Sequence, residues 1–133
     1  MVTLREFLDS PWSLVVYHGD EDVFRSREKD LHGLVKYLDE TDVGSEPIVF
    51  FDRYVGRAAA GLMLLRSPAR VATGVVSEAG RAMLEEHQVP LLADRTVQYL
   101  MNVASDGMCR WEKFSLDKTP NELLAALRRE YDG

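Results

Sequence analysis

The distribution of apolar residues predicts alternating strands and helices, organised around one stretch in the middle of the chain. A continuous apolar run after Pro47, at positions 48–51, is typical of a buried strand. The segment 55–65 that follows is small or apolar on nearly every side, which indicates a helix with no face for solvent. We expect the remaining elements to pack around this strand and helix.

The N-terminal part predicts a short helix, a hairpin and a longer helix. Thr3 and Glu6 have the spacing of a capping box, so a helix should begin at Leu4, end before Pro11 and cover one edge of the sheet. The β-rich runs 13–17 and 23–25 flank a turn-forming cluster, which predicts an antiparallel hairpin. Helical periodicity predicts an amphipathic helix over 30–40, with the apolar positions Leu31, Leu34, Val35 and Leu38.

The C-terminal part continues the alternation. We expect a strand over 70–76, a helix from Ser77 to about His87, a strand over 90–94, a helical turn over 96–101 and a loop over 102–107. A second capping box at 119–122 begins a terminal helix that should bury Leu123, Leu124, Leu127 and Tyr131. Consecutive strand–helix–strand units imply parallel strands. The predicted fold is α/β: one domain, residues 1–133, forming a three-layer α/β/α sandwich with a mixed, deaminase-like sheet.

Composition and charge narrow the function classes. The 133 residues are 46% hydrophobic and 29% charged, as in ordinary globular proteins. The net charge is -6 and the basic residues are dispersed among acidic ones, so no nucleic-acid partner is expected. The first residues carry no apolar run of signal length, and the helix over 55–65 is too short to cross a bilayer, so no membrane role is expected. The single cysteine fits a reducing, cytoplasmic compartment.

Two helix starts should form a binding site at the carboxyl ends of neighbouring strands. Asp52 is placed to cap the central helix, and Ser77 and Glu78 begin the next one. Arg57 falls in the first turn, where the helix dipole disfavours a cation unless an anion is near. With Gly56 allowing close approach, the site would take a phosphate, a carboxylate or a nucleobase edge. Alternatively, these residues only cap the helices and balance their dipoles.

Cys109 is the one candidate nucleophile of its type. It follows a polar loop and precedes Glu112 by three positions. A thiol needs a base or a positive field to react, and the partners in the sequence are Lys113, Arg110 or a distant histidine. Alternatively, Cys109 is a small buried apolar residue.

The three histidines do not predict a metal site. His18-Gly19-Asp20 imitates half of a zinc deaminase signature, but the Pro-Cys-x-x-Cys half is absent. His18, His32 and His87 each have an adequate structural explanation, so we expect no metal and no cofactor.

Three motifs together resemble a known family. They are Asp52-Arg53-Tyr54-Val55-Gly56-Arg57-Ala58-Ala59-Ala60, then Val76-Ser77-Glu78, then Asp106-Gly107-Met108-Cys109 with Glu112-Lys113. Their order and spacing are similar to an uncharacterised prokaryotic family, domain of unknown function 1893, over roughly residues 13–125. The family is grouped with the cytidine-deaminase-like fold although it lacks the zinc ligands. Arg57 replaces its usual lysine, which excludes an amine nucleophile there, and Arg110 replaces a common proline.

The resemblance implies a set of site residues. As catalytic candidates it implies Cys109, Glu112 and Asp52, and as ligand-binding candidates Gly56, Arg57, Ser77, Glu78, Asn102 and Gly107. The leading hypothesis is a zinc-free, deaminase-like domain that binds a small nucleotide-like or anionic metabolite, with any chemistry at Cys109. The alternative is a non-catalytic regulatory or interaction module in which the helix over 55–65 forms a homodimer seam.

Overall fold

The computed structural model of the chain describes residues 1–101 and 107–132. The strands are β1 (Leu14–His18), β2 (Glu21–Ser26), β3 (Ile48–Val55), β4 (Arg70–Ser77) and β5 (Leu91–Val97). The helices are α1 (Leu4–Leu8), α2 (His32–Glu40), α3 (Arg57–Leu64), α4 (Glu78–Glu86), α5 (Arg110–Phe114) and α6 (Pro120–Asp132), with a 3-10 turn over Ser115–Asp117.

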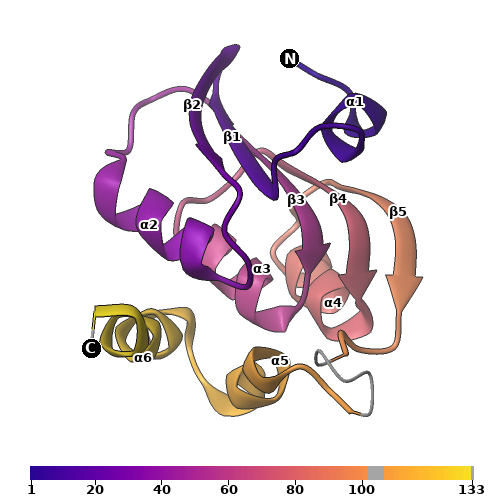
Figure 1. Cartoon of the computed structure of the whole chain (residues 1–133), viewed down its shortest axis with the longest axis vertical. Helices are drawn as coiled ribbons and strands as arrows, with labels where there is room; N and C mark the ends of the chain where they lie inside the picture. The colour runs from indigo at the N-terminus through magenta and orange to yellow at the C-terminus, as the bar shows by residue number, and fades with distance from the viewer. Residues whose placement is uncertain (102–106, 133) are drawn as a thin grey trace.

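The strands form one mixed sheet in the order β2-β1-β3-β4-β5. β1 pairs antiparallel with both β2 and β3, whereas β3, β4 and β5 are parallel. The predicted hairpin, the predicted parallel strands and the α/β class with a mixed sheet are therefore confirmed. The arrowheads of the three parallel strands point toward α5 in Figure 1, so their carboxyl ends share one edge of the sheet.

One face of the sheet is covered by α1. The predicted capping box is present, because Thr3 and Glu6 satisfy each other's backbone N–H groups. Phe7 packs against a small core formed by β1, β3 and β4. Arg53, on β3, extends toward the same segment and donates hydrogen bonds to the backbone carbonyls of Leu8 (3.0 Å) and Trp12 (2.8 Å). The helix thus lies on a face of the sheet, and the expectation that it covers an edge is wrong.

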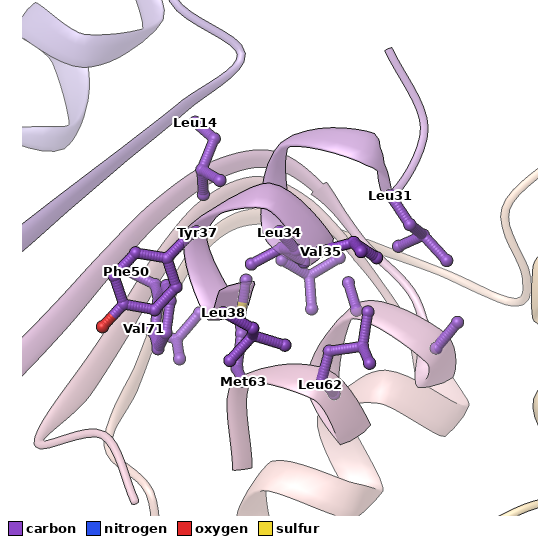
Figure 2. Packing of buried hydrophobic residues seen from close by; sticks show 14 of the residues in the cluster. Leu14, Leu31, Leu34, Val35, Tyr37, Leu38, Phe50, Leu62, Met63 and Val71 are labelled. Carbon is purple, nitrogen blue, oxygen red and sulfur yellow. The ribbon is translucent and has the colours of Figure 1, made fainter. Parts of the chain in front are cut away.

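The larger core lies on the opposite face, under α2, α3 and α4. Figure 2 shows Leu34 and Leu38 of α2 close to Leu62 and Met63 of α3, with the ring of Tyr37 beside β3. The α6 helix packs on α2 and α3, and its capping box at 119–122 is present (Figure 1). Leu123, Leu124 and Leu127 are buried as predicted, whereas Tyr131 is only partly buried against the same core.

Two local predictions are wrong. The segment 96–101 was expected to form a helical turn, but β5 continues to Val97 and pairs there with Ser77. Thr96 and Val97 are β-branched, and the ladder along β4 provides partners for their backbone groups. Asp52 does not cap the central helix, because β3 runs on to Val55 and the residue at the N-cap of α3 is Gly56.

The apolar surface of α3 is buried within the chain. Its residues from Ala58 to Met63 are all buried, with α2, α4 and α6 packed against the helix. The helix therefore offers no exposed seam for a second copy, and this geometric reason for a homodimer is removed. Among the described residues, no helix combines the length and apolarity needed to cross a membrane.

Candidate functional site

A pocket of about 1000 Å³ opens at the carboxyl ends of the parallel strands. Asp52 and Tyr54 of β3, Val75 of β4 and Arg95 of β5 contribute to its wall. Further parts come from the start of α2, the first turn of α3 and α5. This is the edge at which ligands gather in parallel α/β sheets, because the chain leaves each strand there to begin a helix.

The N-terminus of α3 is capped by a residue from far along the chain. Gly56 has no side chain to offer, so the first N–H groups of the helix lack a local acceptor. The Glu112 side chain fills this role: its Oε1 accepts a hydrogen bond of 2.6 Å from the Arg57 backbone N–H. Glu112 is only 2% exposed. A buried carboxylate at a helix N-terminus is favoured by the helix dipole and by its hydrogen bonds.

The same carboxylate also joins α4 and the segment after β5. The Ser77 hydroxyl donates to Glu112 Oε1 (3.2 Å) and accepts from the Gly80 N–H, which makes Ser77 the N-cap of α4 as predicted. The Leu100 N–H donates to Oε2 at 3.1 Å. Glu112 therefore ties together the starts of two helices and the chain beyond the last strand.

Two glycines allow this close packing. A Cβ atom at position 56 would lie 2.7 Å from Glu112 Oε2 and 2.9 Å from Oε1. A Cβ atom at position 80 would lie 2.9 Å from the Gly56 carbonyl carbon. Both distances are shorter than any real Cβ contact, so the two helix starts meet this closely only because both positions are glycine.

The anion expected at the paired helix starts is thus supplied by the chain itself. Arg57 does lie in the first turn of α3, but its guanidinium donates to the Ser115 carbonyl at 3.0 Å and does not line the pocket. Neither Ser77 nor Glu78 lines it. The structure brings Gly56 and Glu112 to the pocket wall and uses Arg57 and Ser77 to brace the helices around it.

Asp52 is the ionisable side chain of the pocket floor. It lies on β3 between Leu14 of β1 and Thr73 of β4, which pair with it in the two ladders. Burial raises the pKa of the Asp52 carboxyl from its usual 3.8 to about 8, and the hydrogen bond from the Tyr54 N–H (3.4 Å to Oδ1) offsets this only in part. Arg53 gives no compensation there, because its guanidinium reaches the carbonyls near α1. At neutral pH Asp52 is mostly a neutral acid.

Cys109 lines the same pocket and is half-buried. It is the N-cap residue of α5, and its backbone N–H donates to the Leu100 carbonyl at 2.6 Å. The predicted cationic partners do not join it: Arg110 lies 4.4 Å over the Trp111 ring and pairs with Glu130, and Lys113 is exposed on the outer side of α5. The pocket thus combines Asp52, Cys109 and Glu112.

The other candidate residues fall outside this group. Gly107 is described but does not line the pocket, and Asn102 lies outside the described residues. His18 meets the Tyr37 hydroxyl at 2.7 Å and His87 meets the Met83 carbonyl at 2.9 Å, whereas His32 stacks on Tyr131 at 4.4 Å. Over residues 1–101 and 107–132, no group of three His, Cys, Asp or Glu side chains is placed to hold a metal ion.

Sequence reasoning missed two walls of the pocket. One is the loop from Glu28 to Leu31 before α2, and the other is the segment from Val97 to Met101 after β5. The sequence pattern predicts only a helix start for the first and a helical turn for the second. A usable signal was the apolar and aromatic character of Val97, Tyr99 and Leu100, which is unusual for a surface loop directly after an edge strand.

Comparison with known proteins identifies the family. The family model described as domain of unknown function DUF1893 matches residues 4–130. The chain belongs to the DUF1893 family. A crystal structure of a DUF1893 family protein from Thermotoga maritima superimposes with a TM-score of 0.83 at 24% identity, over 96% of this chain and 86% of that one. No curated protein matches this DUF1893 chain. The resemblance expected from the three motifs is confirmed at the level of the family.

Replacement of Gly56 by alanine should destabilise this DUF1893 chain strongly. The added Cβ would overlap the Glu112 carboxylate, and we expect a loss of about 2–4 kcal/mol in the free energy of unfolding, measured by urea denaturation. Gly44→Ala is the matched control, because its Cβ would meet only the mobile end of the exposed Glu46 side chain. The double variant Gly56→Ala/Glu112→Ala should lose less free energy of unfolding than the sum of the losses in the two single variants. If the two losses were strictly additive, the close contact between position 56 and the Glu112 carboxylate would be contradicted.

Asp52 should make stability depend on pH. Because its pKa is raised to about 8 on folding, the native state holds a proton that the unfolded chain releases above about pH 4. The stability that this proton contributes is fully present below pH 4 and is lost as pH rises to about 8. Over this range the free energy of unfolding should fall by up to about 1.4 kcal/mol per pH unit. Asp52→Asn removes the titration, so the stability of the variant relative to wild type should rise between about pH 4 and pH 8 and change no further above pH 8. If the free energies of unfolding of the two proteins, measured in urea, changed with pH in parallel, the raised pKa of Asp52 would be refuted.

Proposed function

We propose that this chain is a zinc-free, cytidine-deaminase-like domain that binds a small, planar, nucleotide-like metabolite in the pocket at the carboxyl ends of β3, β4 and β5. The observation that carries the proposal is the Asp52 carboxyl, held on the floor of a pocket of about 1000 Å³ at a cost in desolvation. A half-buried ionisable group whose pKa is raised by desolvation in a cavity is typical of a functional site, because folding alone gains nothing from it.

The walls of the pocket suit a flat organic molecule. Leu14, Leu34, Ala59, Val75 and Trp111 give the lining apolar and aromatic surface beside its polar side chains. Such walls bury the faces of a ring, while a polar group on the floor fixes its orientation. The volume is ample for a nucleobase with an attached sugar.

The position of a negative charge on the ligand follows from Glu112. Because its carboxylate already occupies the start of α3, a phosphate or carboxylate of the ligand would be repelled there. Lys29 and Arg95 are exposed cations among the pocket-lining residues. We therefore assign the anionic end of a nucleotide-like ligand to the pocket mouth and its ring to Asp52.

Cys109 supports a catalytic version of the proposal. Its thiol lines the same pocket as a carboxyl able to give or take a proton, which is the pairing that covalent catalysis needs. Glu112 is assigned a bracing role in this proposal, because its oxygens accept hydrogen bonds from Arg57, Ser77 and Leu100. The second candidate function is a non-catalytic interaction module. If it is correct, the pocket should retain no small molecule.

Purified protein should retain a metabolite that depends on Asp52. We expect native mass spectrometry, after incubation with a cell metabolite extract, to show the same adduct in repeated preparations. Asp52→Leu should reduce its occupancy at least tenfold, since one buried hydrogen-bonding group contributes about 1–3 kcal/mol. Asp94→Leu is the matched control, because Asp94 is exposed on β5 and does not line the pocket. Absence of any reproducible adduct would favour the interaction module.

The Cys109 thiol should be open to reagents in the folded protein. We expect iodoacetamide to alkylate native Cys109 at neutral pH, because the side chain is half-buried and faces a solvent-filled pocket. The retained metabolite should slow this labelling several-fold. Mass spectrometry of the alkylated protein gives both rates. Labelling that occurs only in denaturant would make Cys109 a packing residue and exclude nucleophilic catalysis.

A further inference from the structure

The ligand class can be narrowed by the surroundings of Asp52, provided that the pocket binds a small molecule as proposed above. Asp52 has apolar or uncharged neighbours in the sheet: Leu14 pairs with it on β1 and Thr73 on β4. The Thr73 hydroxyl is buried and donates to the Val75 carbonyl, so it is not directed at the carboxyl. Arg53, next to it in sequence, also contributes to the pocket lining, but its guanidinium donates to the carbonyls of Leu8 and Trp12 near α1.

Other charged and titratable groups reach the pocket from each surrounding element. From the loop before α2 come Glu28, Lys29 and Asp30, all exposed, and β5 contributes the exposed Arg95. Tyr54, Tyr99 and Cys109 are further titratable groups of the lining. Glu112 is the buried carboxyl of the lining, whereas Asp52 is half-buried, and Glu112 is held by donors from Arg57, Ser77 and Leu100. Within the described part of the pocket, no buried cation balances a negative charge on Asp52.

We propose that Asp52 acts as a neutral acid that binds the paired donor–acceptor edge of an uncharged ring, an N–H next to a carbonyl or a ring nitrogen, and so selects lactam- or amidine-type heterocycles. One oxygen, Oδ1, already accepts from the Tyr54 N–H, which leaves Oδ2 to carry the proton. The Oδ2–H then donates to the ligand's acceptor, and Oδ1 has a second lone pair for the ligand's N–H. The two hydrogen bonds close a ring, as in a carboxylic acid–amide pair.

This arrangement discriminates by charge as well as by shape. A carboxylate ligand would face the oxygens of Asp52 and Glu112 without a buried cation, and its desolvation would not be offset. An amine would require Asp52 to lose its proton and would bind more tightly as pH rises. A lactam requires the protonated acid, so its binding weakens as pH rises past about 8, where Asp52 ionises.

Four small probes test the ligand class: 2-pyridone, N-methyl-2-pyridone, benzoate and benzylamine. We expect 2-pyridone to shift the amide resonances of residues lining the pocket at pH 7, and N-methyl-2-pyridone to bind at least tenfold more weakly. Above pH 8 the affinity for 2-pyridone should fall toward tenfold per pH unit. Asp52→Asn keeps a donor and an acceptor, so it should retain binding at pH 7 and lose the pH dependence. Asp52→Leu should bind none of the four.

The outcomes separate this inference from the proposed function. If benzylamine binds best and its affinity rises with pH, Asp52 does not bind as a neutral acid and the inference is overturned. The proposed function would stand, because the pocket would still bind a small molecule. Equal binding of 2-pyridone and its N-methyl derivative would also overturn it. If no probe shifts any pocket residue and no metabolite is retained, the proposed function fails together with the inference.

Discussion

The contact on which this structure depends most is the one between the Glu112 carboxylate and the start of α3. A helix that begins at a glycine has no side chain to satisfy its first N–H groups, and burying them unpaired would cost several kcal/mol. Glu112 removes this cost and also receives donors from Ser77 and Leu100. The requirement for glycine at 56 follows from the same contact, since a Cβ there would overlap the carboxylate, whereas a Cβ at 80 would overlap the backbone of Gly56.

This internal cap also determines what the pocket can bind. The helix N-termini would otherwise attract an anion from solution, but the Glu112 carboxylate already occupies the start of α3. Asp52 is a pocket-lining carboxyl that remains available to a ligand, and the guanidinium of the next residue, Arg53, donates to the Trp12 carbonyl. Strand alternation thus keeps the Asp52 carboxyl and the Arg53 guanidinium from pairing. Desolvation without a paired cation raises the pKa of the Asp52 carboxyl to about 8.

Much of the fold could be predicted from the sequence because its signals are local. The capping boxes at 3–6 and 119–122, the hairpin turn and the periodicity of 31–38 each involve residues a few positions apart. The cap of α3 could not be predicted in this way, because Glu112 lies 55 positions from Arg57. The motif residues Asp52, Gly56, Ser77, Cys109 and Glu112 could be selected, but which of them face a ligand depends on long-range packing.

The role of Glu112 as the internal cap of α3 is tested most directly by chemical rescue. In Glu112→Ala the donors of Arg57, Ser77 and Leu100 would face a small space beside the pocket, large enough for formate. We expect the melting temperature of Glu112→Ala to be several degrees higher in sodium formate than in sodium chloride of equal ionic strength. The melting temperature of wild type should be the same in both salts. Equal melting temperatures in the two salts for Glu112→Ala would contradict it.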